Sequence, residues 1–178
     1  MISWTGVFIG VIMAKYSNGL LVILLAWLMS GCVSVGELKN QSMLRGFNAM
    51  QHENVGWNEP QARQSVKRMV KLGVNAVVLI TFLEQDSISS LQVRHSDAVT
   101  FDQLKSAVQY AHDFDLEVIL KPQILVHNAW ASAITHRQQR DWNQWFESYS
   151  ERIVEYAKFA SRHKVHTFVI GTELSNAS

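Results

Sequence analysis

Short apolar runs rich in β-branched residues alternate with longer amphipathic stretches from Ser42 onward. The apolar runs cover residues 43–48, 74–82, 116–122 and 165–171. The second run is almost continuously apolar, as expected of a strand that is covered on both faces. Alternation of this kind predicts βα units and a parallel sheet. It limits the chain to folds in which helices cover such a sheet.

The stretches between these runs predict three helices with recognisable ends. Pro60 stands in the first turn of the first helix, and Gly73 ends that helix. Thr100 and Gln103 form a capping-box pattern at the start of the second helix. Asp141 is placed to cap the third helix, whose aromatic and aliphatic residues recur at spacings of three and four. We interpret that apolar stripe as core packing rather than as a cofactor site.

Four strands and three helices make up about half of a (β/α)8 barrel, which takes roughly 250 residues. The chain has 178 residues, and only a few of them follow the fourth predicted strand. We therefore expect an α/β fold over residues 43–178 that corresponds to the N-terminal half of a TIM barrel, truncated after its fourth strand. No Gly-rich phosphate-binding loop of either common type occurs, which argues against a nucleotide-binding fold.

Residues 1–31 have the pattern of an export signal. They contain no Asp or Glu and a single Lys, and an apolar run over 19–29 is followed by Ser-Gly-Cys32. Such a run fits a signal peptide and falls short of the roughly 20 residues that span a bilayer as a helix. Small residues before a cysteine resemble the lipidation signal of bacterial lipoproteins. We expect Cys32 to carry a lipid, 32–42 to form a linker, and the protein to be anchored in the bacterial cell envelope.

Two alternatives stay open for this leader. Residues 4–14 are also apolar, so 1–31 would also fit one long membrane anchor interrupted by the polar residues 15–18. Alternatively, translation starts at Met13, which gives the charged-then-apolar order typical of a signal peptide.

The charge balance and the cysteine count exclude several classes of function. The 16 Lys and Arg residues against 15 Asp and Glu give a net charge of +1, so we expect no nucleic-acid partner. A single Cys excludes an internal disulfide and any zinc site that needs several thiolates. The 7 His residues include no HExxH pattern. We expect no metal and no cofactor.

In barrels of this type, reactive groups lie at the C-terminal ends of the strands. Glu173 follows the fourth predicted strand, just after Gly171, where we expect glycine to let the backbone bend away from the strand. A carboxyl group in that position can protonate the oxygen of a leaving group. The residues alone leave open the alternative that Glu173 is a solvated acid in a terminal loop.

Five motifs in order resemble clan A glycoside hydrolases, most closely glycoside hydrolase family 113, which contains β-mannanases. The motifs are Arg45-Gly-Phe-Asn48, Gly73-Val-Asn-Ala-Val77, Leu120-Lys-Pro122, the aromatic helix from Trp142 to Tyr149, and Phe168-Val-Ile-Gly-Thr-Glu-Leu174. The resemblance implies retaining hydrolysis of a β-linked polysaccharide such as mannan, with Glu173 as the general acid/base. It also implies a nucleophile from a seventh strand, which this sequence does not contain. Many clan A members carry Asn directly before the acid/base, whereas Thr172 is at this position here. The resulting Gly-Thr-Glu sequence is closer to family 113 than to the wider clan.

Further residues near the predicted strand ends are candidates for binding a polysaccharide or oligosaccharide. Trp130 would stack on a sugar ring while His127 and Asn128 contact hydroxyl groups, or Trp130 packs under the barrel mouth. Trp57 has the same two interpretations. Lys121 either binds a substrate hydroxyl or pairs with an interior acid.

Two classes of function therefore remain. The first is an exported glycosidase-like protein that hydrolyses a β-linked polysaccharide if its barrel is complete. The second is a non-catalytic glycan-binding or remnant lipoprotein, because half a barrel lacks the nucleophile. A seventh-strand carboxylate in adjoining sequence would distinguish them. Two half-barrels could also associate and cover each other's strand edges, with each Glu173 facing its copy, and we expect this self-association to be minor.

Overall fold

The computed structural model describes residues 43–177, which contain one five-stranded sheet. Its strands are β1 (Gly46–Ala49), β2 (Ala76–Gln85), β3 (Arg94–His95), β4 (Glu117–Val126) and β5 (Thr167–Phe168). The helices are α2 (Pro60–Lys71), α3 (Phe101–His112) and α4 (Gln139–Arg162), with the 3-10 turn η1 (Ala131–Ala133) before α4. The predictions for the leader, the start at Met13, the lipid on Cys32 and the linker all lie outside the described residues.

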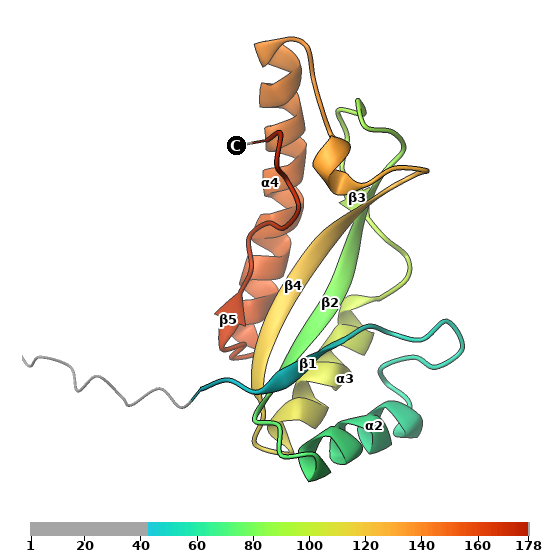
Figure 1. Ribbon diagram of the computed structural model, residues 1–178, viewed down its shortest axis with the longest axis vertical. Helices are drawn as coiled ribbons and strands as arrows, with labels where there is room; N and C mark the ends of the chain where they lie inside the picture. The colour runs from blue at the N-terminus through green and yellow to red at the C-terminus, as the bar shows by residue number, and fades with distance from the viewer. Residues whose placement is uncertain (1–42, 178) are drawn as a thin grey trace, which may run out of the picture. The chain divides into compact units, whose positions relative to one another are not determined.

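The parallel strands follow one another across the sheet in the order β1-β2-β4-β5 (Figure 1). β2 and β4 pair over their full ten residues, from Ala76 with Glu117 to Gln85 with Val126. β3 is antiparallel and joins only the C-terminal end of β2. Each new parallel strand lies beside the previous one, as in a barrel, whereas the strand order of a doubly wound sheet reverses. The predicted α/β fold with a partial barrel is confirmed.

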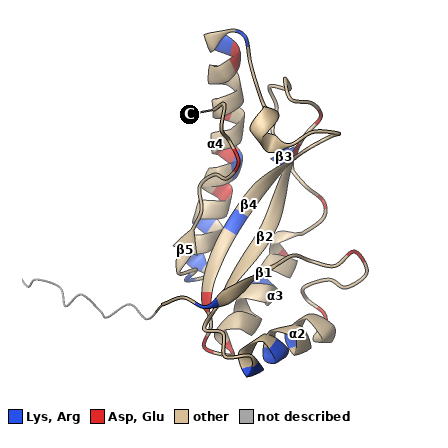
Figure 2. Ribbon diagram, in the orientation of Figure 1, with Lys and Arg blue, Asp and Glu red and all other residues tan. Residues whose placement is uncertain are grey.

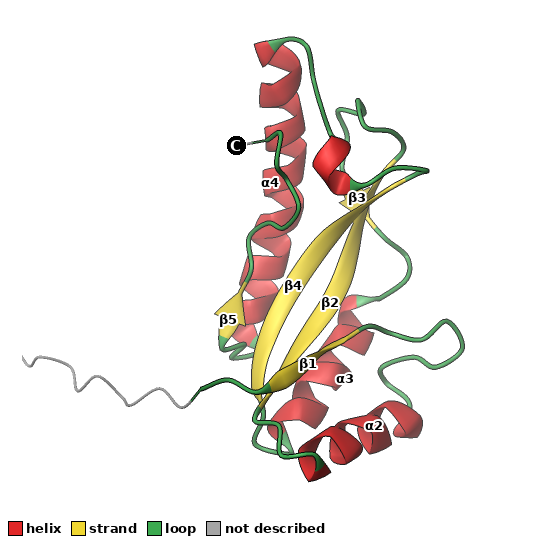
Figure 3. Ribbon diagram, viewed as in Figure 1, coloured by secondary structure: helices red, strands yellow, loops and turns green. Residues whose placement is uncertain are grey.

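The two faces of the sheet differ in what covers them. Helices α3 and α4 lie against one face (Figure 3), and Thr81 of β2 and Tyr156 of α4 share a 3.1 Å hydrogen bond between their hydroxyl groups there. Because successive residues point to opposite faces, the alternate residues of β2 and β4 point away from these helices. We call that side the inner face, since it corresponds to the interior of a barrel. It carries Val78, Ile80, Phe82, Glu84, Ile119, Lys121, Gln123 and Leu125.

Both central strands are longer than the sequence pattern predicts. The expected ends were Phe82 and Pro122, but β2 continues to Gln85 and β4 to Val126. Pro122 is tolerated because its nitrogen faces the β5 side of β4. The last bond on that side runs from the Val169 N–H to the Leu120 carbonyl, so no ladder partner is lost at Pro122.

The outer strands are shorter than predicted, and most of the helix ends are as predicted. β1 covers 46–49 rather than 43–48, and β5 covers 167–168 rather than 165–171. The capping box of Thr100 forms, and Gly73 follows α2 with a φ of 80°. Asp141 does not cap α4, because the helix begins two residues earlier, at Gln139. No helix within residues 43–177 is long and apolar enough to span a membrane.

Candidate active site

Glu173 lies just beyond β5, at the C-terminal ends of the parallel strands. Its backbone is in the left-handed region, with a φ of 58°. A residue with a side chain rarely adopts this conformation, which is strained by roughly 1–2 kcal/mol. The bend that we expected at Gly171 is therefore located at Glu173, and Gly171 does not have a positive φ. Glycine at 171 instead avoids crowding, because a Cβ there would lie 3.3 Å from the Tyr149 hydroxyl oxygen.

Two contacts hold the segment that carries Glu173. The Tyr149 hydroxyl group donates a 2.6 Å hydrogen bond to the carbonyl oxygen of Ile170. The Asn176 amide donates a 3.0 Å bond to the carbonyl oxygen of Ser132 in η1. Figure 1 shows this terminal segment running beside α4. The position of Glu173 is thus fixed from both sides along the chain.

Glu173 lines a cavity of about 280 Å³, which we call the Glu173 cavity. Its other lining residues are Gln123, Ile124, Leu125, Val126, Ala129, Trp130 and Ala131. Trp130 is 77% exposed, so its indole ring is accessible to a ligand in the same cavity as Glu173. Among residues 43–177, Glu173 is the only Asp or Glu that lines this cavity.

His127 and Asn128 line a second cavity, of about 540 Å³, which we call the polar cavity. Its other lining residues are Glu84, Gln85, Asp86, Arg94, Leu125 and Val126. Asn128 has a φ of 56° in a tight turn that follows β4. The two cavities share Leu125 and Val126 and therefore adjoin at the end of β4. Four predicted site residues line them, namely His127, Asn128, Trp130 and Glu173.

Lys121 is placed differently from what the sequence predicts. Because β4 continues past Pro122, Lys121 lies in the middle of the strand, where it forms the single blue segment of β4 in Figure 2. On the inner face it is one layer, about 7 Å, deeper than Gln123. Lys121 lines neither of the two cavities at the strand ends.

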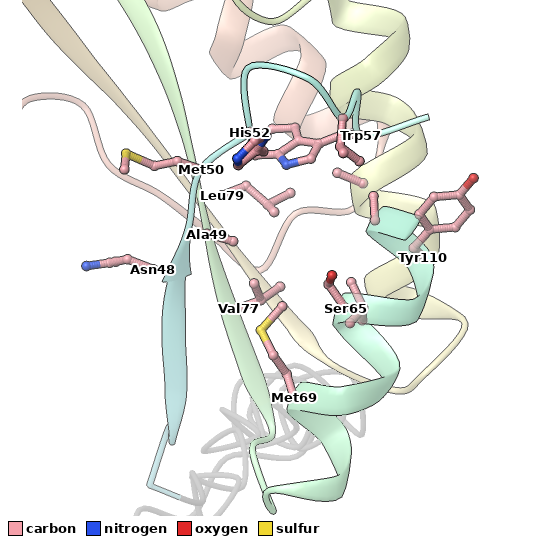
Figure 4. A pocket seen from close by; sticks show the side chains of 14 residues that line it. Asn48, Ala49, Met50, His52, Trp57, Ser65, Met69, Val77, Leu79 and Tyr110 are labelled. Carbon is pink, nitrogen blue, oxygen red and sulfur yellow. The ribbon is translucent and has the colours of Figure 1, made fainter. Parts of the chain in front are cut away.

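Trp57 is also apart from the other predicted site residues. Its side chain is 6% exposed and belongs to the hydrophobic core, as the packing interpretation describes. It lines an apolar cavity of about 290 Å³ between β1, α2 and α3. Figure 4 shows Val77 and Leu79 pointing toward α2 in this cavity, whereas Asn48 points to the opposite side of β1. The cavity therefore lies on the helix side of the sheet, away from Glu173.

The sequence analysis missed an ion-pair cluster in the polar cavity. Arg94 Nη1 lies 2.7 Å from Asp86 Oδ1, and Arg94 Nη2 lies 3.4 Å from Glu84 Oε2. The Ser96 hydroxyl group also donates to Glu84. The hydrogen bond and the charge of Asp86 raise the pKa of Arg94 above its ordinary value. The sequence analysis ends this strand at Phe82, whereas Leu83 and Gln85 are buried in the structure and β2 continues far enough to pair Glu84 with Arg94.

No set of three or more His, Cys, Asp and Glu side chains within the described part of the chain is arranged to hold a metal ion. The chemistry available at the strand ends is that of a carboxyl group, an exposed indole and hydrogen-bonding polar groups. This combination suits an uncharged ligand with many hydroxyl groups and an acid-labile bond.

The sequence profile of glycoside hydrolase family 113 matches residues 46–178. Two solved structures of a GH113 β-1,4-mannanase, one of them a complex, are 26% identical to the chain with a TM-score of 0.67. Each match covers 77% of this chain and 48% of the solved chain. The GH113 β-mannanase from Alicyclobacillus acidocaldarius, in complex with ManMIm, has a TM-score of 0.71 at 24% identity. That match covers 78% of this chain and 47% of the other.

The search of curated proteins gives no significant match. The chain spans about half the length of the solved structures it matches, in agreement with its partial barrel. The family profile covers most of the chain, including the whole sheet and Glu173. The chain belongs to glycoside hydrolase family 113.

Proposed function

We propose that this chain supplies the acid/base half of a retaining hydrolase of β-linked mannan, with Glu173 as the general acid/base. The observation that carries the proposal is the position of Glu173, five residues after β5, in a strained backbone conformation and in the same cavity as Trp130. Strained residues cluster at active sites, where the surrounding structure holds them in place. The β-mannanases among the similar structures support mannan as the substrate.

In this mechanism a sugar ring stacks on Trp130 and brings its glycosidic oxygen to the Glu173 carboxyl group. Glu173 protonates that oxygen as the bond to the sugar breaks, and then takes a proton from the water that hydrolyses the covalent intermediate. The covalent step needs a second carboxylate roughly 5–5.5 Å away. No other acid of residues 43–177 lines the Glu173 cavity, so in the proposal the nucleophile comes from a strand outside the described residues.

The test joins the full chain to the second half of the β-1,4-mannanase whose structure it matches. We expect this fusion to hydrolyse β-1,4-mannohexaose. Glu173→Gln should slow that reaction by roughly 10²–10⁴-fold, the usual contribution of a general acid. A dinitrophenyl β-mannoside has a leaving group that needs no protonation, so the release of dinitrophenol should survive the substitution as an initial burst.

Glu147→Gln is the matched control, because Glu147 is an exposed acid on α4 and should leave both reactions unchanged. A folded fusion in which Glu173→Gln hydrolyses mannohexaose as fast as the parent contradicts the assignment. So does a Glu173→Gln variant that loses the reactions of both substrates equally, because a general acid should matter less for the better leaving group.

A second candidate function is sugar binding without hydrolysis. The observation in its favour is that Glu173 is the only acid of the described residues that lines the Glu173 cavity, whereas retaining hydrolysis needs two carboxylates. Two measurements together distinguish the candidates. The first is the binding of mannohexaose by the unfused chain in an NMR titration, and the second is the hydrolysis of mannohexaose by the fusion. Binding by the chain together with an inactive but folded fusion supports the binding function. Hydrolysis by the fusion supports the enzyme.

We also propose that the protein is exported and anchored through a lipid on Cys32. The support is the sequence pattern alone, in which an apolar run precedes Ser-Gly-Cys32. Expression in a bacterial host should give a membrane-bound protein whose mass shows loss of the leader and gain of lipid. Cys32→Ser should abolish the lipid, and an unchanged mass in that variant would contradict the proposal.

A further inference from the structure

One row of side chains crosses the inner face at the C-terminal ends of the strands. Glu84 of β2 pairs in register with Arg94 of β3 on one side and with Leu125 of β4 on the other. Residues that pair across neighbouring strands point to the same face of the sheet. Leu125 lines the polar cavity and the Glu173 cavity alike. The row therefore leads from Arg94 to the Glu173 cavity, and its first two strand spacings span about 10 Å.

The side chain at the far end of this row is held in place and still has hydrogen-bond donors to offer. Arg94 is fixed by Asp86 at 2.7 Å and by Glu84 at 3.4 Å, and about half of its side-chain surface is accessible. A guanidinium group has five N–H donors, so N–H groups beyond these two contacts are available to a ligand. The two carboxylates can accept hydrogen bonds beside them. Neighbouring sugar hydroxyl groups require this mixture of donors and acceptors.

The charges and the lining favour a neutral sugar over an anion. Arg94 faces two carboxylates, so the cluster carries one net negative charge and would repel an acidic sugar. Leu125 is 44% exposed between the two cavities and offers an apolar surface to the C–H face of a ring. The polar cavity, at about 540 Å³, lies within the range of roughly 300–1,000 Å³ typical of small-molecule sites.

We propose that the polar cavity is a distal sugar subsite, in which Arg94, held by Asp86 and Glu84, binds hydroxyl groups of a mannan chain that extends across Leu125 from Glu173. The inference rests on the proposed function, because it takes the substrate from there. It assigns Arg94 a role in recognising chain length. A short oligosaccharide fills only the Glu173 cavity, whereas a longer one also reaches Arg94.

The test measures the affinity of the full chain for β-1,4-mannotriose and β-1,4-mannohexaose by NMR titration. Arg94→Ala should weaken mannohexaose binding by about tenfold or more, since hydrogen bonds to charged groups contribute about 1.5–3 kcal/mol. Mannotriose binding should stay within about twofold. Arg94→Lys should recover part of the loss, because the charge remains and the planar fork does not. Asp86→Asn, at an exposed position that tolerates exchange, should weaken mannohexaose binding a few-fold through poorer positioning of Arg94.

Arg63→Ala is the matched control. Arg63 also makes an exposed ion pair, at 3.1 Å to Asp113, but it lies on α2, outside both cavities. It should leave both affinities unchanged. If Arg94 only stabilises the pairing of β3 with β2, Arg94→Ala will weaken the binding of both sugars equally or of neither. Either result overturns the subsite. If the unsubstituted chain binds neither sugar, the subsite is overturned, whereas the proposed function is decided separately by hydrolysis in the fusion.

Discussion

The Tyr149 hydroxyl group donates a 2.6 Å hydrogen bond to the carbonyl oxygen of Ile170, three residues before Glu173. Tyr149 belongs to α4, and its side chain is 8% exposed. Burial raises the pKa of Tyr149 to about 12, so the hydroxyl group remains a donor at every pH at which the protein would work. Its ring stacks on that of Trp145, with the ring centroids 5.0 Å apart. A helix that covers the sheet thereby positions the segment that carries the candidate acid.

Tyr149→Phe should lower the free energy of unfolding by about 0.5–1.5 kcal/mol, the usual net contribution of a hydrogen bond. The substitution keeps the ring and its stacking, so the loss reports the hydroxyl group alone. Urea denaturation measures it. Tyr110→Phe is the control, because the Tyr110 hydroxyl donates to the Asn58 carbonyl at 3.2 Å near the surface, where water can replace the partner. Equal losses in both variants would contradict a larger contribution from the part-buried bond of Tyr149 than from the exposed bond of Tyr110.

Much of the fold follows from local sequence signals. Pro60, Gly73 and the Thr100 capping box mark helix ends through chemistry within a few residues, and the structure agrees at all three. The prediction that Asp141 caps α4 is wrong, because the N-cap residue is Gln138, which makes no side-chain cap hydrogen bond, and a helix start of that kind has no sequence signature. The prediction that the strand ends at Pro122 is wrong, because a proline interrupts a strand only where its nitrogen faces a neighbouring strand that still pairs, and β5 no longer pairs beside Pro122.

The candidate site was predictable in part. The position of Glu173 follows from the order of strands, since the ends of parallel strands meet at one edge of the sheet. The bend at Glu173 was assigned to Gly171, because glycine is the usual residue for such a bend. The row from Arg94 to Leu125 depends on the register between strands that are far apart in sequence. Spacing along the chain carries no information on that register.

Gly46→Ala should destabilise the chain by about 1–3 kcal/mol, the usual effect of overpacking. β1 passes so close to β2 that a Cβ at residue 46 would collide with the backbone carbonyl of Ala76. Backbone atoms cannot rotate away as a side chain can, so the strands must separate. Gly171→Ala is the milder comparison, because its Cβ would meet side-chain atoms of Leu174 and Tyr149 at 3.2 and 3.3 Å. Thermal unfolding that ranks Gly171→Ala as the more damaging change would refute this.

Acid should destabilise the chain partly through His163. Burial, with the positive charges of Lys105 and Arg162, lowers the pKa of His163 below 6.5. The unfolded chain then binds the proton more tightly, so the contribution of His163 to stability is complete above about pH 6.5 and is lost as the pH falls through the lowered pKa. His163→Gln should therefore lose less stability than the parent between about pH 7 and pH 5. An NMR titration in which the His163 ring protonates at or above pH 6.5 would contradict the explanation.

The conformation of Glu173 leads to a prediction that separates stability from function. An alanine at this position keeps the strain of the left-handed backbone, whereas glycine relieves it. Glu173→Gly should therefore be about 1 kcal/mol more stable than Glu173→Ala in urea denaturation. Lys164, with a φ of 55° just after α4, is the control, because Lys164→Gly and Lys164→Ala should differ by a similar amount.

The two positions should differ in activity. In the fusion with the second barrel half, both Glu173 variants should fail to hydrolyse mannohexaose, while both Lys164 variants should keep the parental rate. A glutamate that persists where glycine would be more stable is a case in which function opposes stability. If Glu173→Gly is instead less stable than Glu173→Ala, the bend is not a source of strain, and the placement of the carboxyl group must be explained by the Tyr149 and Asn176 contacts alone.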